Sequence, residues 1–293
     1  MNPAATRTAL AGGREHWQHG PIDLVIAVDG DAAAVARAYA RAWTRFQGVL
    51  DELVAELPLL RTRVDQVSAA RGVVARRMVA ATRPFAAEFI TPMAAVAGSV
   101  AQEIAGIFAA EAGVRKAYVN NGGDIALHLA AGESLAIGLV ANAYAPALDV
   151  QVEISAASGI RGVATSGWRG RSFSLGVADS VTVLAHSASA ADAAATMIAN
   201  AVNVEHPAIA RAPADTLKDD TDLGLRLVTV EVGELPADAC AIALDRGYAA
   251  ANLYLRRGLI IGAALALKNQ WRTIGRLGGA DLEQASPLTR LAA

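Results

Sequence analysis

An acidic and a hydroxyl side chain one helical turn apart form the sharpest chemical pattern in the sequence. Asp192 and Thr196 lie in the alanine-rich stretch 188–203, whose composition predicts a helix. A separation of four residues places the carboxylate and the hydroxyl on one helical face. Mg²⁺ suits such ligands, because it takes one or two protein carboxylates and completes its shell with water and substrate phosphates. Taken alone, an aspartate near a helix start is also typical of a cap or a partner of the helix dipole.

Two polar segments that contain glycine could bind an anion. The first runs from Asn120 to Asp124 between two predicted strands, where paired glycines let backbone N–H groups turn toward a ligand. The same residues are also typical of an ordinary hairpin turn. The second segment ends another predicted strand with two hydroxyls, and Arg169 and Arg171 follow closely enough to neutralise an anion. An exposed loop is the alternative there. The candidate contacts are Asn121, Gly122, Gly123, Asp124, Thr165, Ser166 and Gly167.

Several other chemistries lack support in the sequence. The five histidines have no zinc-site spacing, and the single cysteine, Cys240, excludes an intramolecular disulfide and a multi-cysteine metal site. No nucleophile elbow, P-loop or dinucleotide fingerprint occurs. The net charge of −2, without a long basic run, argues against a nucleic-acid partner. Apolar runs such as 259–267 are shorter than the ~20 residues that a bilayer requires, and no secretory signal is visible, so we expect a cytoplasmic protein without a membrane partner.

The elements that must position these residues alternate between helical and extended patterns. A strand at 22–28 precedes a helical stretch that Asp31 could cap, and Thr91-Pro92 opens a second helix rich in small residues. Strand-like runs then fill 116–185, and helix 188–203 follows them. A Pro/Asp-rich loop is expected at 207–222, before a strand–helix–strand unit at 224–276. We predict an α+β fold with mixed or antiparallel sheets layered with helices, in a single domain over residues 1–293.

The order of four motifs resembles the ApbE-like superfamily of flavin transferases. These motifs are V-N-N-G-G-D-I at 119–125, V-A-T-S-G at 163–167, S-V-T-V-L-A at 180–185 and A-D-A-A-A-T at 191–196. The resemblance covers roughly residues 90–205 and implies a T-fold-like architecture. Members of the main family use FAD and Mg²⁺ to attach FMN through a phosphoester to a threonine or serine of a target protein. The family's metal ligands would fall on Asp192 and Thr196, and its N-G-G-D loop on 121–124.

Two motifs of the main family have no counterpart here. Its lysine-glycine motif appears as Val96-Ala97-Gly98-Ser99, without a lysine. After Thr-Ser-Gly, the family's histidine and D-P-x-T-G segment are replaced by R-G-R-S-F-S-L-G-V-A-D. The retained frame could therefore hold a phosphorylated or anionic ligand other than FAD.

Three hypotheses about function follow. The first is an enzyme in which a divalent cation neutralises a phosphate. Its most specific version is flavin transfer to an acceptor flavoprotein. Asp124 or Asp179 is the candidate base. The second is a biosynthetic or catabolic enzyme on the same fold, with Cys240 as a thiol if it is exposed. The third is a flavin-binding accessory module. A homodimer is plausible, because alanine-rich helices offer smooth packing faces.

Overall fold

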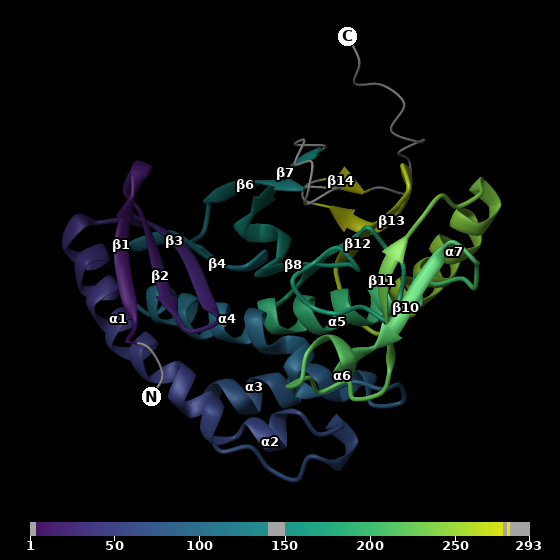
Figure 1. The fold of residues 1–293 in the computed structure, drawn as a ribbon. Coiled ribbons are helices and arrows are strands. Elements are labelled where there is room, and N and C mark those ends of the chain that lie inside the picture. The colour runs from purple at the N-terminus through teal and green to yellow at the C-terminus, as the bar shows by residue number, and fades with distance from the viewer. Residues whose placement is uncertain (1–3, 140–149, 278–279, 282–293) are drawn as a thin grey trace.

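One antiparallel sheet carries the candidate residues on its middle strands (Figure 1). The computed structural model describes residues 4–139, 150–277 and 280–281. In spatial order the strands of this sheet are β1 (Thr6–Leu10), β2 (Arg14–His19), β3 (Ile22–Gly30), β4 (Val114–Asn121), β5 (Asp124–Leu129), β8 (Gly162–Ser166), β9 (Ser180–Ala185), β12 (Gly262–Leu267), β13 (Gln270–Leu277) and β14 (Ala280–Asp281). Two separate antiparallel pairs are β6 (Ser134–Leu139) with β7 (Val150–Ser155), and β10 (Ile209–Pro213) with β11 (Leu227–Val232).

The helices gather mainly on one side of this sheet. They are α1 (Ala32–Ala55), α2 (Leu57–Leu60), α3 (Val73–Thr82), α4 (Val96–Ala109), α5 (Ala188–Ala201), α6 (Ala214–Leu217) and α7 (Ala237–Arg256). Short 3-10 turns are η1 (Ala11–Gly13), η2 (Val64–Gln66), η3 (Arg83–Phe85), η4 (Pro92–Ala95) and η5 (Ala156–Ser158). In Figure 1, α1, α3, α4 and α5 lie below the strands and the β6–β7 pair lies above them. This arrangement confirms the predicted α+β class, with antiparallel pairing throughout the described strands.

Apolar cores on both faces hold the middle of the sheet rigid. On the helix side, Ala164 of β8 and Val183 of β9 are buried in one cluster with Ile198 of α5. On the other face, Ile154 of β7 packs in one cluster with Leu184 of β9. Strand β9 is buried along its whole length because it is covered from both sides. Residues on neighbouring strands therefore have little freedom to shift.

The structure differs from the sequence prediction in three elements. Strands β1 and β2 form an N-terminal hairpin that was not predicted, since charged residues interrupt its alternation of buried and exposed side chains. The expected loop at 207–222 contains β10 and the short helix α6. The helix expected to open at Thr91-Pro92 begins with a 3-10 turn, and regular α-helix starts only at Val96.

One described segment, Pro92–Ala109, is long and apolar enough to cross a membrane by length and composition alone. Half of its residues are buried inside the protein, where α4 packs against β4, β5 and α5. A core helix of a soluble protein has the same composition, and this packing is of that type. This segment is therefore only weak evidence of a membrane span, and the cytoplasmic location stays a prediction.

Candidate functional site

The structure brings two aspartates together between the sheet and helix α5. Asp124 is the first residue of β5, and Asp192 lies in the second turn of α5. Asp124 accepts a hydrogen bond from the backbone N–H of Thr165. Asp192 Oδ2 accepts one from the backbone N–H of Gly98, at 2.8 Å. Strand β8 thus supplies one amide to Asp124, and the start of α4 supplies the amides of Ala97 and Gly98 to Asp192.

Burial hinders the ionisation of both carboxyl groups. Burial raises the pKa of Asp124 to about 7, although the Thr165 amide opposes the shift. Burial also raises the pKa of Asp192 well above its usual value, and the negative charge of Asp124 adds to the effect. Neither carboxylate forms an ion pair with any residue that the structure describes. Two close acids without a cationic partner are an arrangement that a proton or a divalent cation would stabilise.

Asp192 also caps helix α4. This contact gives Asp192 a role as a helix cap, the alternative to a metal ligand. The N-cap residue Ala95 has no side-chain acceptor, and the carboxylate of Asp192 takes its place from the neighbouring helix. A Cβ atom on Gly98 would lie 2.3 Å from the Ala188 carbonyl oxygen and 2.9 Å from Asp192 Cβ. Only glycine therefore allows α4 and α5 to approach this closely. The small residues that the sequence places in this helix thus have a structural role at the contact with α5.

Thr196 follows Asp192 on α5 and is partly buried. Its side chain forms no hydrogen bond within the described ranges, so its hydroxyl is available to a ligand. Those ranges contain no group of three or more His, Cys, Asp or Glu residues that could hold a metal. A cation at this place would thus have two carboxylates and a hydroxyl as protein ligands. That donor set fits Mg²⁺, which keeps several waters or phosphate oxygens in its shell.

The N-G-G-D segment is a tight turn between β4 and β5, as the hairpin alternative required. Gly122 and Gly123 have φ values of 65° and 115°, which favour glycine. The Gly123 N–H donates to Asn120 Oδ1 at 2.8 Å, so this amide is used inside the turn. Asn121 is buried, and its side chain donates to the Ala97 carbonyl oxygen at 3.2 Å. The segment therefore positions Asp124 and joins the sheet to the start of α4.

The second predicted segment lies at the end of β8 beside the first. The hydroxyl oxygens of Thr165 and Thr182 are 2.9 Å apart across the β8–β9 pair, and Thr165 is exposed. Ser166 is partly buried, and Gly167 is packed so closely that a Cβ atom would lie 2.5 Å from the Asp179 carbonyl oxygen. Thr165 thus contacts the carboxylate pair through its backbone N–H, which donates to Asp124.

The two arginines that follow have different surroundings. Arg169 Nε lies 3.4 Å from Asp179 Oδ1, and its guanidinium stacks 4.5 Å from the Trp168 ring centroid. Arg171 is exposed and has no ion pair among the described residues. Its Nη1 lies 2.8 Å from the position that a Cβ atom on Gly122 would take. Arg171 therefore lies over the N-G-G-D turn and is the cation available to a ligand there.

Asp179, the other candidate base, has structural partners instead. Its Oδ2 accepts from the Lys268 backbone N–H at 2.7 Å, and its Oδ1 accepts from Trp168 Nε1 at 3.1 Å. Lys268 has a φ of 47°, in the tight turn between β12 and β13. Asp179 lines a separate cavity of about 390 Å³ together with Cys240. Cys240 is buried and burial raises the pKa of its thiol, which argues against the thiol hypothesis.

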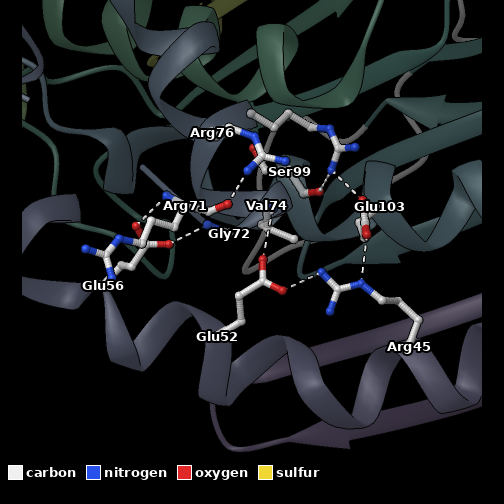
Figure 2. Close-up of polar contacts among 10 residues, drawn as sticks. Arg45, Glu52, Glu56, Arg71, Gly72, Val74, Arg76, Ser99 and Glu103 are labelled. Carbon is white, nitrogen blue, oxygen red and sulfur yellow. Dashed lines mark hydrogen bonds and ion pairs between the residues drawn. The ribbon is translucent and has the colours of Figure 1, made fainter. Parts of the chain in front are cut away.

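A network of charged residues on α1, α3 and α4 supports the amides that hold Asp192 (Figure 2). Glu103 of α4 pairs with Arg45 at 2.8 Å and with Arg77 at 3.0 Å. Burial opposes ionisation of Glu103, but these two arginines hold its pKa below the usual value. Arg77 also donates to the Ser99 carbonyl oxygen at 3.2 Å, one residue after Gly98. The start of α4 is therefore fixed relative to α1 and α3.

Comparison with known proteins places the chain in a family. Residues 7–273 match the family model described as AbpE bacteria. A UPF0280 protein of Methanopyrus kandleri is 35% identical over 199 residues, which are 67% of this chain and 77% of that protein. A UPF0280 protein of Methanothermobacter thermautotrophicus is 38% identical over 179 residues, or 60% and 67% of the two chains. The apo crystal structure of Pseudomonas stutzeri flavinyl transferase ApbE aligns with a TM-score of 0.40 and 13% identity, covering 95% of this chain and 98% of that one. The family match confirms the resemblance predicted from the motifs, and the chain belongs to the AbpE bacteria family.

Proposed function

We propose that the protein is a divalent-cation-dependent enzyme acting on a phosphorylated ligand. One observation carries the proposal: Asp124 and Asp192 lie close together, both with raised pKa values and without a cationic partner among the described residues. Thr196 adds a hydroxyl on the helix that bears Asp192. A bound Mg²⁺ would neutralise phosphate oxygens and stabilise a leaving oxygen.

The most specific form of this proposal is FMN transfer from FAD to an acceptor flavoprotein, which the family membership supports. An acceptor hydroxyl would form a P–O bond to the FMN phosphorus while the P–O bond to the AMP oxygen breaks. Because Asp124 would coordinate the cation with Asp192, the hydroxyl proton would pass to solvent rather than to this carboxylate. Arg171 would hold the phosphate of the ligand over the N-G-G-D turn.

Calorimetric titration with FAD, with and without Mg²⁺, tests this proposal on the wild type and on Asp192→Asn. Asparagine keeps an oxygen acceptor for the Gly98 amide but removes the charge, so the fold is preserved. We expect binding that depends on Mg²⁺ in the wild type and loses that dependence in the variant. Equal binding in both would contradict the proposal. FAD binding without turnover on any acceptor would instead support the accessory-module hypothesis.

A further inference from the structure

Helix α7 exposes a group of large apolar side chains on the side that faces away from the rest of the protein. Ile242, Tyr248 and Leu253 are 48%, 37% and 45% exposed. Each of the other helices within the described ranges exposes at most one such side chain. The opposite side of α7 packs against α5, β12 and β13, and the helix lies near the right-hand edge of the ribbon in Figure 1. Apolar side chains grouped on one exposed face are typical of an interaction surface, whereas isolated ones are not.

The spacing along α7 arranges five exposed or half-buried positions in one stripe. Ile242, Ala249 and Leu253 are seven and four residues apart, so they follow one another along one helical face. An exposed charged residue continues the face at each end, Asp238 in the first turn and Arg256 in the last. These two residues are separated by about five helical turns, so they point in the same direction as the apolar residues between them. We call these five residues the α7 stripe.

The charges at the two ends of the stripe have no ionic partner in the part of the chain that the structure describes. Neither Asp238 nor Arg256 forms an ion pair there. Asp245, at the side of the same face, is paired with Arg272 at 2.9 Å. An acid at the start and a base at the end of a helix also favour the helix dipole. The dipole does not account for the exposed apolar side chains between them.

The order of charges makes the stripe complementary to a second copy of itself. In a two-fold symmetric interface, residue i of one copy contacts residue j of the other, and j contacts i. If two copies of α7 pack antiparallel, Asp238 of each copy lies opposite Arg256 of the other. Ile242 then lies beside Leu253 of the other copy, and the small side chain of Ala249 lets the helices approach closely. A parallel arrangement would instead place like charges opposite each other.

We propose that the protein forms a homodimer in which α7 packs antiparallel against α7 of a second copy. The sequence favoured a homodimer through alanine-rich helices in general. Most alanines of α5 are buried inside the protein, however, so that helix has no smooth face to offer. The α7 stripe shares no residue with the cation site at Asp124, Asp192 and Thr196. This inference and the proposed function can therefore fail separately.

Sedimentation equilibrium of the full chain tests the apolar part of the interface. We expect the wild type to be a dimer and the double variant Ile242→Asp/Leu253→Asp to be a monomer at the same concentration, because the interface would bury unpaired charges. Val54→Asp is the matched control, since Val54 is 46% exposed but lies on α1, and it should leave the dimer intact. Circular dichroism melts of each variant verify that it folds.

Exchange of the end charges tests the antiparallel order. Asp238→Arg and Arg256→Asp each place like charges opposite each other at both ends, so each should weaken self-association at least about tenfold. An equimolar mixture of the two variants restores opposite charges at both ends and should dimerise as tightly as the wild type. If the substitutions acted only by weakening the helix within each chain, mixing would restore nothing.

A wild-type chain that stays monomeric up to its solubility limit would overturn the inference. A dimer that persists in the folded Ile242→Asp/Leu253→Asp variant would overturn it too, because another surface would then form the contact. Folded charge variants that stay monomeric when mixed would overturn the antiparallel order.

Discussion

At the scale of single residues, the central feature is the carboxylate pair of Asp124 and Asp192, one member of which also caps α4. Both aspartates receive backbone amides, yet burial raises both pKa values, and the charge of Asp124 raises that of Asp192 further. A charge without a partner in such a place is costly, so a proton or a cation would stabilise the pair near neutral pH. The same geometry thus serves the capping of α4 and the proposed chemistry.

This pair predicts how the stability of the metal-free protein depends on pH. In the unfolded chain both aspartates lose their protons near pH 4, whereas folded Asp124 keeps its proton up to about pH 7. The folded state thus binds more protons in this window, and stability falls as the pH rises through it. Asp124→Asn removes the part of this effect that Asp124 contributes. In EDTA, the melting temperature of the Asp124→Asn variant should equal that of the wild type near pH 4. Near pH 8 it should be higher, by about 2–4 °C for each kcal/mol of destabilisation that the substitution removes.

Circular dichroism melts of both proteins across this pH range check the prediction. Adding Mg²⁺ near pH 8 should raise the melting temperature of the wild type and leave that of Asp124→Asn unchanged, because only the ionised pair binds the cation. If the difference in melting temperature between wild type and Asp124→Asn stayed constant with pH, it would contradict the raised pKa of Asp124.

At the scale of elements, the contact between α4 and α5 determines where Asp192 lies. Gly98→Ala should destabilise the protein by about 1–3 kcal/mol, since the new Cβ atom would overlap the Ala188 carbonyl and push the helices apart. Gly106→Ala is the matched control in the same helix. Gly106 has open space at its Cβ position, so alanine there should stabilise by about 0.5–1 kcal/mol.

Urea denaturation of the two variants measures this difference. Gly98→Ala should also weaken Mg²⁺ binding, because the Gly98 amide orients Asp192. If both glycine substitutions changed stability equally, the close approach of the helices would not be a constraint.

The sequence predicted these elements unevenly, for physical reasons. Helix α5 and strands β8 and β9 were predicted because their alanine-rich and β-branched runs agree with their burial. Asp124 and Asp192 were both named as candidates, but their pairing was not, because it depends on how α5 crosses the start of β5. The capping role of Asp192 on α4 required contacts between residues 94 positions apart. Local sequence patterns also could not predict the contact of Asp179 with the turn between β12 and β13.

At the scale of the whole molecule, one sheet runs from the N-terminal hairpin to the C-terminal strands. Strand β9 pairs with β8 on one side and β12 on the other. It therefore joins residues 119–196, which contain the four sequence motifs, to the last third of the chain. A single domain over residues 1–293 stays a prediction. We expect one cooperative unfolding transition, with equal calorimetric and van't Hoff enthalpies, in differential scanning calorimetry. Two separated transitions would show that the two halves fold independently.

Calorimetric titration of metal-free protein with Mg²⁺, near pH 8 and near pH 5, measures whether the carboxylate pair binds a cation. We expect saturable binding near pH 8 that is lost near pH 5, because the raised pKa values of Asp124 and Asp192 favour their protonated forms at the lower pH. Asp124→Asn and Asp192→Asn should each abolish it, and Asp245→Asn, which removes an exposed carboxylate elsewhere, should not. No binding by the wild type near pH 8, or unchanged binding in both site variants, would contradict the claim.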